Sequence, residues 1–71
     1  MIASSPRPLF VNGERRELTA RTLAEALGEL GYREATVATA LNGHFVPARK
    51  REETNLAEGD RVEIVAPRQG G

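Results

Sequence analysis

The residue types that most often carry out chemistry are few in this sequence and lie far apart. His44 is the single histidine, so it cannot supply a histidine-rich zinc site, and we expect it to face solvent beside a turn. Glu52 and Glu53 are adjacent, but the polar sequence around them offers no apolar pocket of the kind that an acid–base pair needs. The stretch from Gly28 to Gly31 lacks the spacing of a phosphate-binding loop. We therefore expect a protein that is not an enzyme and binds no metal or cofactor itself.

Composition excludes further classes of function. The 71 residues contain no cysteine, which rules out disulfides, thiolate metal sites and cysteine nucleophiles. Lys and Arg total 10 and Asp and Glu total 10, whereas nucleic-acid-binding domains carry a basic excess. The run 49–53 neutralises itself and is expected to be a solvated loop, with binding to an acidic surface as the alternative. No apolar run is long enough to span a membrane, and residues 1–8 lack the charged and apolar regions of a signal peptide, so none is expected. We expect a cytoplasmic protein that binds neither nucleic acid nor membrane.

The last two residues, Gly70 and Gly71, remain as a chemical candidate. Glycine has no Cβ, so this end of the chain fits a narrow channel and accepts any backbone angle. Residues 67–71 can extend at most ~18 Å, which is enough to enter the active site of another protein. The terminal carboxylate is a poor electrophile and reacts only after activation, as in an acyl-adenylate. Taken alone, the dipeptide is weak evidence for a function, because a frayed end or a cloning remnant also explains it.

The first half of the sequence predicts a hairpin followed by a helix. Residues 9–11 and 15–19 flank Asn12-Gly13, a pair typical of a two-residue hairpin turn. Thr22 and Glu25 have the spacing of a capping box, in which each side chain accepts a hydrogen bond from a backbone N–H of the first turn. The following leucines and alanines recur at helical spacing, and Gly31 is placed to end the helix with a left-handed cap.

The second half predicts three more strands. Residues 37–41 and 44–46 flank a second Asn-Gly pair, and Pro47 ends the second of these strands. Residues 48–55 have no clear period and are expected to form a loop with a short turn of helix. Residues 61–66 alternate between apolar and charged side chains, which is typical of a strand with one buried face.

These elements predict an α+β fold in which one helix covers one face of a small mixed sheet, the β-grasp or ubiquitin-like arrangement. We expect a flexible N-terminal arm over residues 1–8, a domain over 9–66 and a flexible tail over 67–71. Strand alternation puts Phe10 and Val65 on the open face of the sheet, and Phe45 can join them. These three residues are either scattered surface residues or a partner-binding face. In either case little of the Phe10 side chain would be covered, so Phe10→Ala is expected to leave stability nearly unchanged.

Several short motifs occur together in a specific order. They are Val11-Asn12-Gly13-Glu14, Thr22-Leu23, Ala40-Leu41-Asn42-Gly43, Val46-Pro47, Gly59-Asp60-Arg61-Val62-Glu63-Ile64-Val65 and Gly70-Gly71. In this combination the sequence resembles the ThiS family of sulfur carriers for thiamine biosynthesis, over residues 9–71. The related MoaD class, which serves molybdopterin synthase, usually has Pro-Pro before its tail, so the single Pro67 favours ThiS. The Ser- and Pro-rich arm and the polar pair Arg68-Gln69 depart from the family pattern.

The resemblance implies a function for the tail. A ThiF-like adenylyltransferase would use ATP to adenylate Gly71, while Gly70 threads the narrow channel. A persulfide from a cysteine desulfurase or a sulfurtransferase would convert the adenylate into a thiocarboxylate, and a ThiG-like thiazole synthase would take the sulfur. Phe10, Val65 and Phe45 would bind the partners. The alternatives are a carrier for molybdopterin synthesis or tRNA thiolation, and a ubiquitin-like binding or conjugating module.

Overall fold

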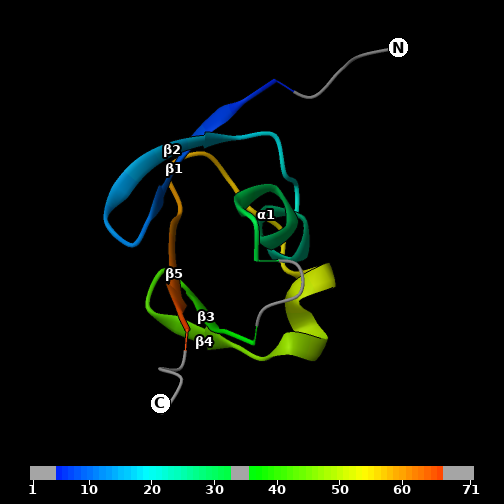
Figure 1. Ribbon diagram of the computed structural model, residues 1–71. Coiled ribbons are helices and arrows are strands. Elements are labelled where there is room, and N and C mark those ends of the chain that lie inside the picture. The colour runs from blue at the N-terminus through cyan, green and yellow to red at the C-terminus, as the bar shows by residue number, and fades with distance from the viewer. Residues whose placement is uncertain (1–4, 33–35, 67–71) are drawn as a thin grey trace.

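The structure is a computed structural model that describes residues 5–32 and 36–66. Within these residues five strands form one mixed sheet in the order β2-β1-β5-β3-β4. β1 and β5 are parallel, and the other neighbours are antiparallel. Figure 1 shows the helices α1 and η1 on the same side of this sheet. The elements are β1 (Arg7–Val11), β2 (Glu14–Leu18), α1 (Leu23–Leu30), β3 (Ala38–Leu41), β4 (His44–Val46), the 3₁₀ helix η1 (Ala48–Glu53) and β5 (Arg61–Val65).

Both Asn-Gly pairs form the tight turns that the sequence predicts. Asn12 and Gly13 have φ angles of 52° and 84°, and Asn42 and Gly43 have φ angles of 51° and 86°. Positive φ at both central residues gives a turn whose twist matches that of the flanking strands. The two antiparallel hairpins, β1–β2 and β3–β4, are therefore confirmed. His44 is the first residue of β4 and is exposed, as expected.

β1 begins earlier than the sequence pattern predicts. Arg7 and Pro8 were assigned to the flexible arm, but both lie in β1 and pair with β2. Pro8 is tolerated because its backbone faces β5 before that strand begins: its carbonyl accepts a hydrogen bond from Gly59, and no ladder partner needs its missing N–H. The Arg7 guanidinium donates to the carbonyls of Ala20 and Leu56 at 2.7 and 3.0 Å. The arm is thus shorter than expected, and its residues 1–4 lie outside the described part of the chain.

The helix forms where the capping box predicts it, with one difference in its hydrogen bonds. The Thr22 hydroxyl accepts from the N–H of Glu25 at 3.2 Å, while the Glu25 carboxylate accepts from Arg21 at 2.8 Å, one residue before the cap. The N–H of Thr22 itself was the expected donor. Gly31 ends the helix with φ 95°. This left-handed conformation strains residues that carry a Cβ, which explains why glycine is at this position.

The core lies between α1 and the sheet. Leu9 and Val11 of β1 alternate with exposed residues and are buried against the helix, as the period of the strand predicts. Val62 and Ile64 of β5 do the same. Ala66 was expected to continue this buried face but is exposed, because β5 ends at Val65. The buried apolar side chains are Leu9, Val11, Leu18, Ala20, Leu23, Ala26, Leu27, Val37, Val46, Leu56, Val62 and Ile64. The predicted α+β fold with one covered face is confirmed.

The short turn of helix expected within residues 48–55 is confirmed, and the charged run 49–53 is exposed, as expected, except at Arg51. The run forms most of η1, and Arg51 reaches under it to the sheet. The Arg51 Nη2 donates to the carbonyl of Val37 at 2.6 Å, and its Nε donates to Thr39 Oγ1 at 3.0 Å. Thr39 is only 2% exposed and donates in turn to the carbonyl of Val46 at 2.8 Å. Arg51 therefore ties η1 to β3.

Candidate functional site

The predicted tail is attached to a central strand. β5 lies between β1 and β3, and its inward side chains Val62 and Ile64 are 1% and 5% exposed. β5 ends at Val65, and Ala66 is the last described residue. The predicted tail of residues 67–71, with Gly70 and Gly71, lies outside the described residues. What the structure provides is the strand that carries the tail, which pairs with β1 as far as Val62 and with β3 as far as Val65.

Two asparagine side chains hold the two ends of β5. At its start, Asn42 Oδ1 accepts from the N–H of Arg61 at 2.9 Å, and Asn42 Nδ2 donates to Asp60 Oδ1 at 3.1 Å. At its end, Asn12 Oδ1 accepts from the N–H of Ile64 at 2.9 Å, and Asn12 Nδ2 donates to the carbonyl of Ile64 at 3.1 Å. Each asparagine thus shapes a hairpin turn and also fixes one end of the strand that carries the tail.

The open face of the sheet contains the three predicted partner residues. Phe10 is 39% exposed, Val65 is 63% exposed and Phe45 is 69% exposed. Strand pairing places Phe10 beside Arg61, Val65 beside Ala38, and Phe45 beside Ala40. All three side chains therefore point away from α1, as the period of the strands predicts. Their role in binding a partner stays a prediction.

The register of the strands places these three residues too far apart to form one continuous apolar patch. At about 4.8 Å per strand and about 3.3 Å per residue, Phe10, Val65 and Phe45 lie roughly 12–16 Å from one another. Glu63 lies between them, because it pairs with Ala40 on β3 and is two residues from Val65 on β5. Glu63 therefore lies near the centre of the open face. The open face thus combines spaced apolar side chains with a central carboxylate.

The remaining charges of the open face are exposed. Arg15 and Glu17 on β2 form an ion pair of 3.2 Å, with side chains 59% and 53% exposed. An ion pair this exposed adds little to stability because water screens it. These charges can instead contribute to the rate and specificity of association with a partner of complementary charge. The open face is therefore suited to a reversible complex.

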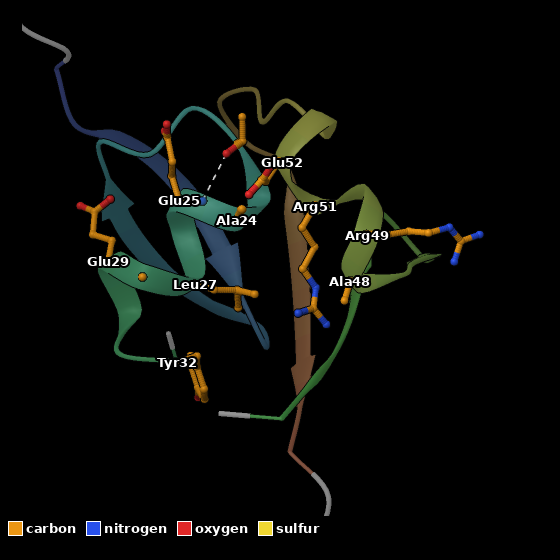
Figure 2. A pocket seen from close by; sticks show the side chains of 11 residues that line it. Ala24, Glu25, Leu27, Glu29, Tyr32, Ala48, Arg49, Arg51 and Glu52 are labelled. Carbon is orange, nitrogen blue, oxygen red and sulfur yellow. Dashed lines mark hydrogen bonds between the residues drawn. The ribbon is translucent and has the colours of Figure 1, made fainter. Parts of the chain in front are cut away.

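A groove of about 910 Å³ lies on the other side of the sheet, between α1 and η1 (Figure 2). It is lined by Thr22, Ala24, Glu25, Leu27, Gly28, Glu29, Tyr32, Ala48, Arg49, Arg51 and Glu52. Two of its carboxylates serve the fold: Glu25 caps α1, and Glu29 accepts hydrogen bonds from the backbone N–H groups of Thr19 and Ala20 at 3.0–3.1 Å. Among residues 5–32 and 36–66, no group of three or more acidic or histidine side chains could hold a metal ion.

Sequence reasoning missed two arginines that matter to the fold. Arg7 stands between two prolines and was assigned to the arm, and Arg51 stands in a run of charges. Each donates to backbone carbonyls from segments that are distant in the sequence. No local pattern marks such a residue, because its partners are set by the tertiary fold.

In the described part of the chain, no helix is long and apolar enough to cross a membrane.

Comparison with known sequences identifies relatives along nearly the whole chain. Residues 9–71 match the family model described as the ThiS family. A sulfur carrier protein ThiS from Thermus thermophilus is 40% identical over 63 residues, which cover 89% of this chain and 98% of that protein. A thiazole synthase from Paramagnetospirillum magneticum is 41% identical over 64 residues, which cover 89% of this chain but 20% of that protein.

A solved structure agrees with these matches. The crystal structure of a thiamine biosynthesis protein (ThiS) from Geobacter metallireducens superposes with a TM-score of 0.74 at 29% identity, over 90% of this chain and 99% of that one. Its agreement in fold and in length supports the β-grasp assignment. On the family match over residues 9–71 and the 40% identity to a carrier of almost the same length, this chain belongs to the ThiS family.

Proposed function

We propose that this chain carries sulfur for the synthesis of the thiazole part of thiamine, as a thiocarboxylate on Gly71. The observation that carries the proposal is the family match, which extends through the Gly-Gly pair to residue 71 and is accompanied by a sulfur carrier that aligns over 98% of its length. Members of this family are small carrier proteins and not catalysts. The chain is then a protein co-substrate whose reactive group is its own terminal carboxyl.

The proposed chemistry proceeds in three steps and leaves every side chain of the carrier unchanged. An oxygen of the Gly71 carboxylate attacks the α-phosphorus of ATP on an adenylyltransferase of the ThiF type, and pyrophosphate leaves. The terminal sulfur of a persulfide on a cysteine desulfurase or a sulfurtransferase attacks the Gly71 carbonyl carbon, and AMP leaves. A thiol then cleaves the acyl disulfide, so that the thiol becomes a disulfide and the carrier keeps a thiocarboxylate. A carrier without cysteine suits these reaction steps because it has no thiol that competes for the sulfur.

We assign the open face of the sheet to the docking of these partners. Its spaced apolar residues Phe10, Val65 and Phe45 can anchor a complex, and Val65 lies one residue before the last described position. A partner held on this face has the base of the tail beside it. Each turnover requires release of the carrier, which favours a small and partly charged interface over a large apolar one.

A thiazole synthase of the ThiG type is the proposed acceptor of the sulfur. The protein named thiazole synthase from Paramagnetospirillum magneticum contains a segment that is 41% identical to this chain, although the chain spans only about a fifth of that protein. A segment similar to this chain within a thiazole synthase favours direct transfer of sulfur from the carrier to the synthase. The chemistry requires ATP and reduced thiols, so we place it in the cytoplasm.

The proposal is tested by intact mass spectrometry of the full chain after incubation with a ThiF-type adenylyltransferase, ATP, a persulfide-loaded donor and a thiol. We expect a mass gain equal to the exchange of one oxygen for sulfur, and no gain in a variant that lacks Gly71. Adducts on lysines of other proteins would instead indicate a conjugating module. Transfer of the sulfur to a molybdopterin synthase and not to a thiazole synthase would overturn the thiamine assignment.

A further inference from the structure

The backbone of Ile64 is held in an unusual way at the edge of β5 that faces β1. The pairing of β1 with β5 extends only over Phe10↔Arg61 and Val11↔Val62, and the N–H of Asn12 donates to the carbonyl of Val62 at 2.9 Å. Two residues further along β5, the N–H and the carbonyl of Ile64 both point to this edge of the strand. There they meet the side-chain amide of Asn12 at 2.9 and 3.1 Å. The amide of Asn12 thus makes the two hydrogen bonds to β5 that a further residue of β1 would make if the ladder continued.

This contact lies where the tail begins. After Ile64 only Val65 belongs to β5, and its ladder partner among the described residues is Ala38 of β3. The backbone of alternate residues faces opposite neighbours, so β3 holds Val65 and Asn12 holds Ile64. Without the Asn12 amide, the β1 side of the strand would be paired only as far as Val62.

We propose that Asn12 is a positioning residue for the tail: its side-chain amide fixes the point and the direction at which the chain leaves the sheet toward Gly71. This inference rests on the proposed function, because a defined starting point for the tail matters only if the tail enters the active site of another protein. Removing the amide leaves the N–H and the carbonyl of Ile64 without these hydrogen bonds, so that among the described residues only β3 holds the end of β5. The terminal carboxylate then starts from a more mobile base.

Asn42 offers a matched control within the same chain. It occupies the same position of the same type of turn, with φ 51° against 52° for Asn12, and its side chain also makes two hydrogen bonds at β5. Asn42 holds the start of the strand and Asn12 holds its end. Both positions have positive φ, so Asn12→Gly and Asn42→Gly each preserve the turn and remove only the amide.

The first experiment measures the position of the tail without any partner. The chain has no cysteine, so Arg49→Cys on the exposed surface of η1 and Gln69→Cys in the tail can carry two spin labels without side reactions. We expect the distance distribution between the labels to broaden in Asn12→Gly and to stay unchanged in Asn42→Gly. Asn12→Asp, which keeps the acceptor for the N–H of Ile64, should give an intermediate width. Equal widths in Asn12→Gly and the parent protein would overturn the proposal.

The second experiment measures adenylation by a ThiF-type enzyme as pyrophosphate release from ATP. We expect Asn12→Gly to lower kcat roughly tenfold, because misplacement of a reacting group by about 1 Å can cost this much or more. KM should change less than twofold, since the open face is intact. Asn42→Gly should keep both constants. A loss of stability alone would affect the two glycine variants alike, so equal kcat values in them would refute a positioning role. If the parent protein itself is not adenylated, the proposed function fails, while the spin-label result still decides whether Asn12 positions the tail.

Discussion

Truncation of the two exposed phenylalanines provides a sharp test of the open face. Phe10 is 39% exposed and Phe45 is 69% exposed, so about three fifths of Phe10 is covered but only about a third of Phe45. A phenylalanine that exposes roughly 200 Å² when extended therefore covers about 120 Å² at position 10 and about 60 Å² at position 45. At about 25 cal/mol per Å², and allowing for the alanine that remains and for a compact unfolded state, Phe10→Ala should cost about 2 kcal/mol and Phe45→Ala about 1 kcal/mol.

This estimate corrects the expectation that Phe10→Ala leaves stability nearly unchanged. For a domain of this size, about 2 kcal/mol corresponds to a decrease in Tm of roughly 8–16 °C, and about 1 kcal/mol to roughly half of that. Thermal unfolding followed by circular dichroism measures both. If the open face binds the adenylyltransferase, each variant should also weaken that complex by about 1–3 kcal/mol in calorimetry.

Phe45→Ala is therefore the cleaner probe of binding, because it disturbs the fold less. A Phe10→Ala protein as stable as the parent would refute the reasoning from covered area. Unchanged binding in both variants would show that the partner does not use these two side chains.

Three further perturbations test other parts of the molecule. Leu27→Ala should cost roughly 2–5 kcal/mol in chemical denaturation, because Leu27 is 6% exposed and its truncation leaves a cavity under α1; a cost below about 1 kcal/mol would contradict its place in the core. Arg51→Met should cost about 1–3 kcal/mol by the same measurement, since it removes the donors to Val37 and Thr39, while Arg49→Met, on an exposed neighbour, should change stability by less than about 0.5 kcal/mol. Deletion of Gly71 should abolish pyrophosphate release with a ThiF-type enzyme and leave Tm unchanged; adenylation of the shortened chain would refute the assignment of the carried group.

The features that sequence alone could predict are those set by local physics. Asn12-Gly13 and Asn42-Gly43 predict their turns because positive φ is a property of those residues, whatever surrounds them. The capping box and the leucine spacing predict α1 for the same reason. The family resemblance rests on these motifs together with the Gly-Gly pair, and it covers the same residues as the family match.

The features that could not be predicted depend on contacts between distant segments. Arg7 was assigned to a flexible arm, yet its guanidinium donates to Leu56, which is 49 positions away in the sequence. The second task of Asn12 is of the same kind: a turn residue is recognisable from its neighbours, but its bond to Ile64 exists only once β5 lies beside β1. The fraction of the Phe10 side chain that is covered likewise depends on the side chains of the neighbouring strands, and the alternation along β1 does not predict it.

The pairing of β1 with β5 also has a consequence for folding kinetics. Asn12 and Ile64 are 52 positions apart, so the strand that bears the tail joins the N-terminal hairpin only by closing a loop of nearly the whole domain. Loop closure of this length is entropically costly and slows folding compared with a chain of local contacts. A chain in which β1 and β5 have not yet paired therefore has no fixed base for Gly71. The topology thus makes presentation of the terminal glycine depend on the pairing of the first and last strands, the contact with the greatest separation along the sequence.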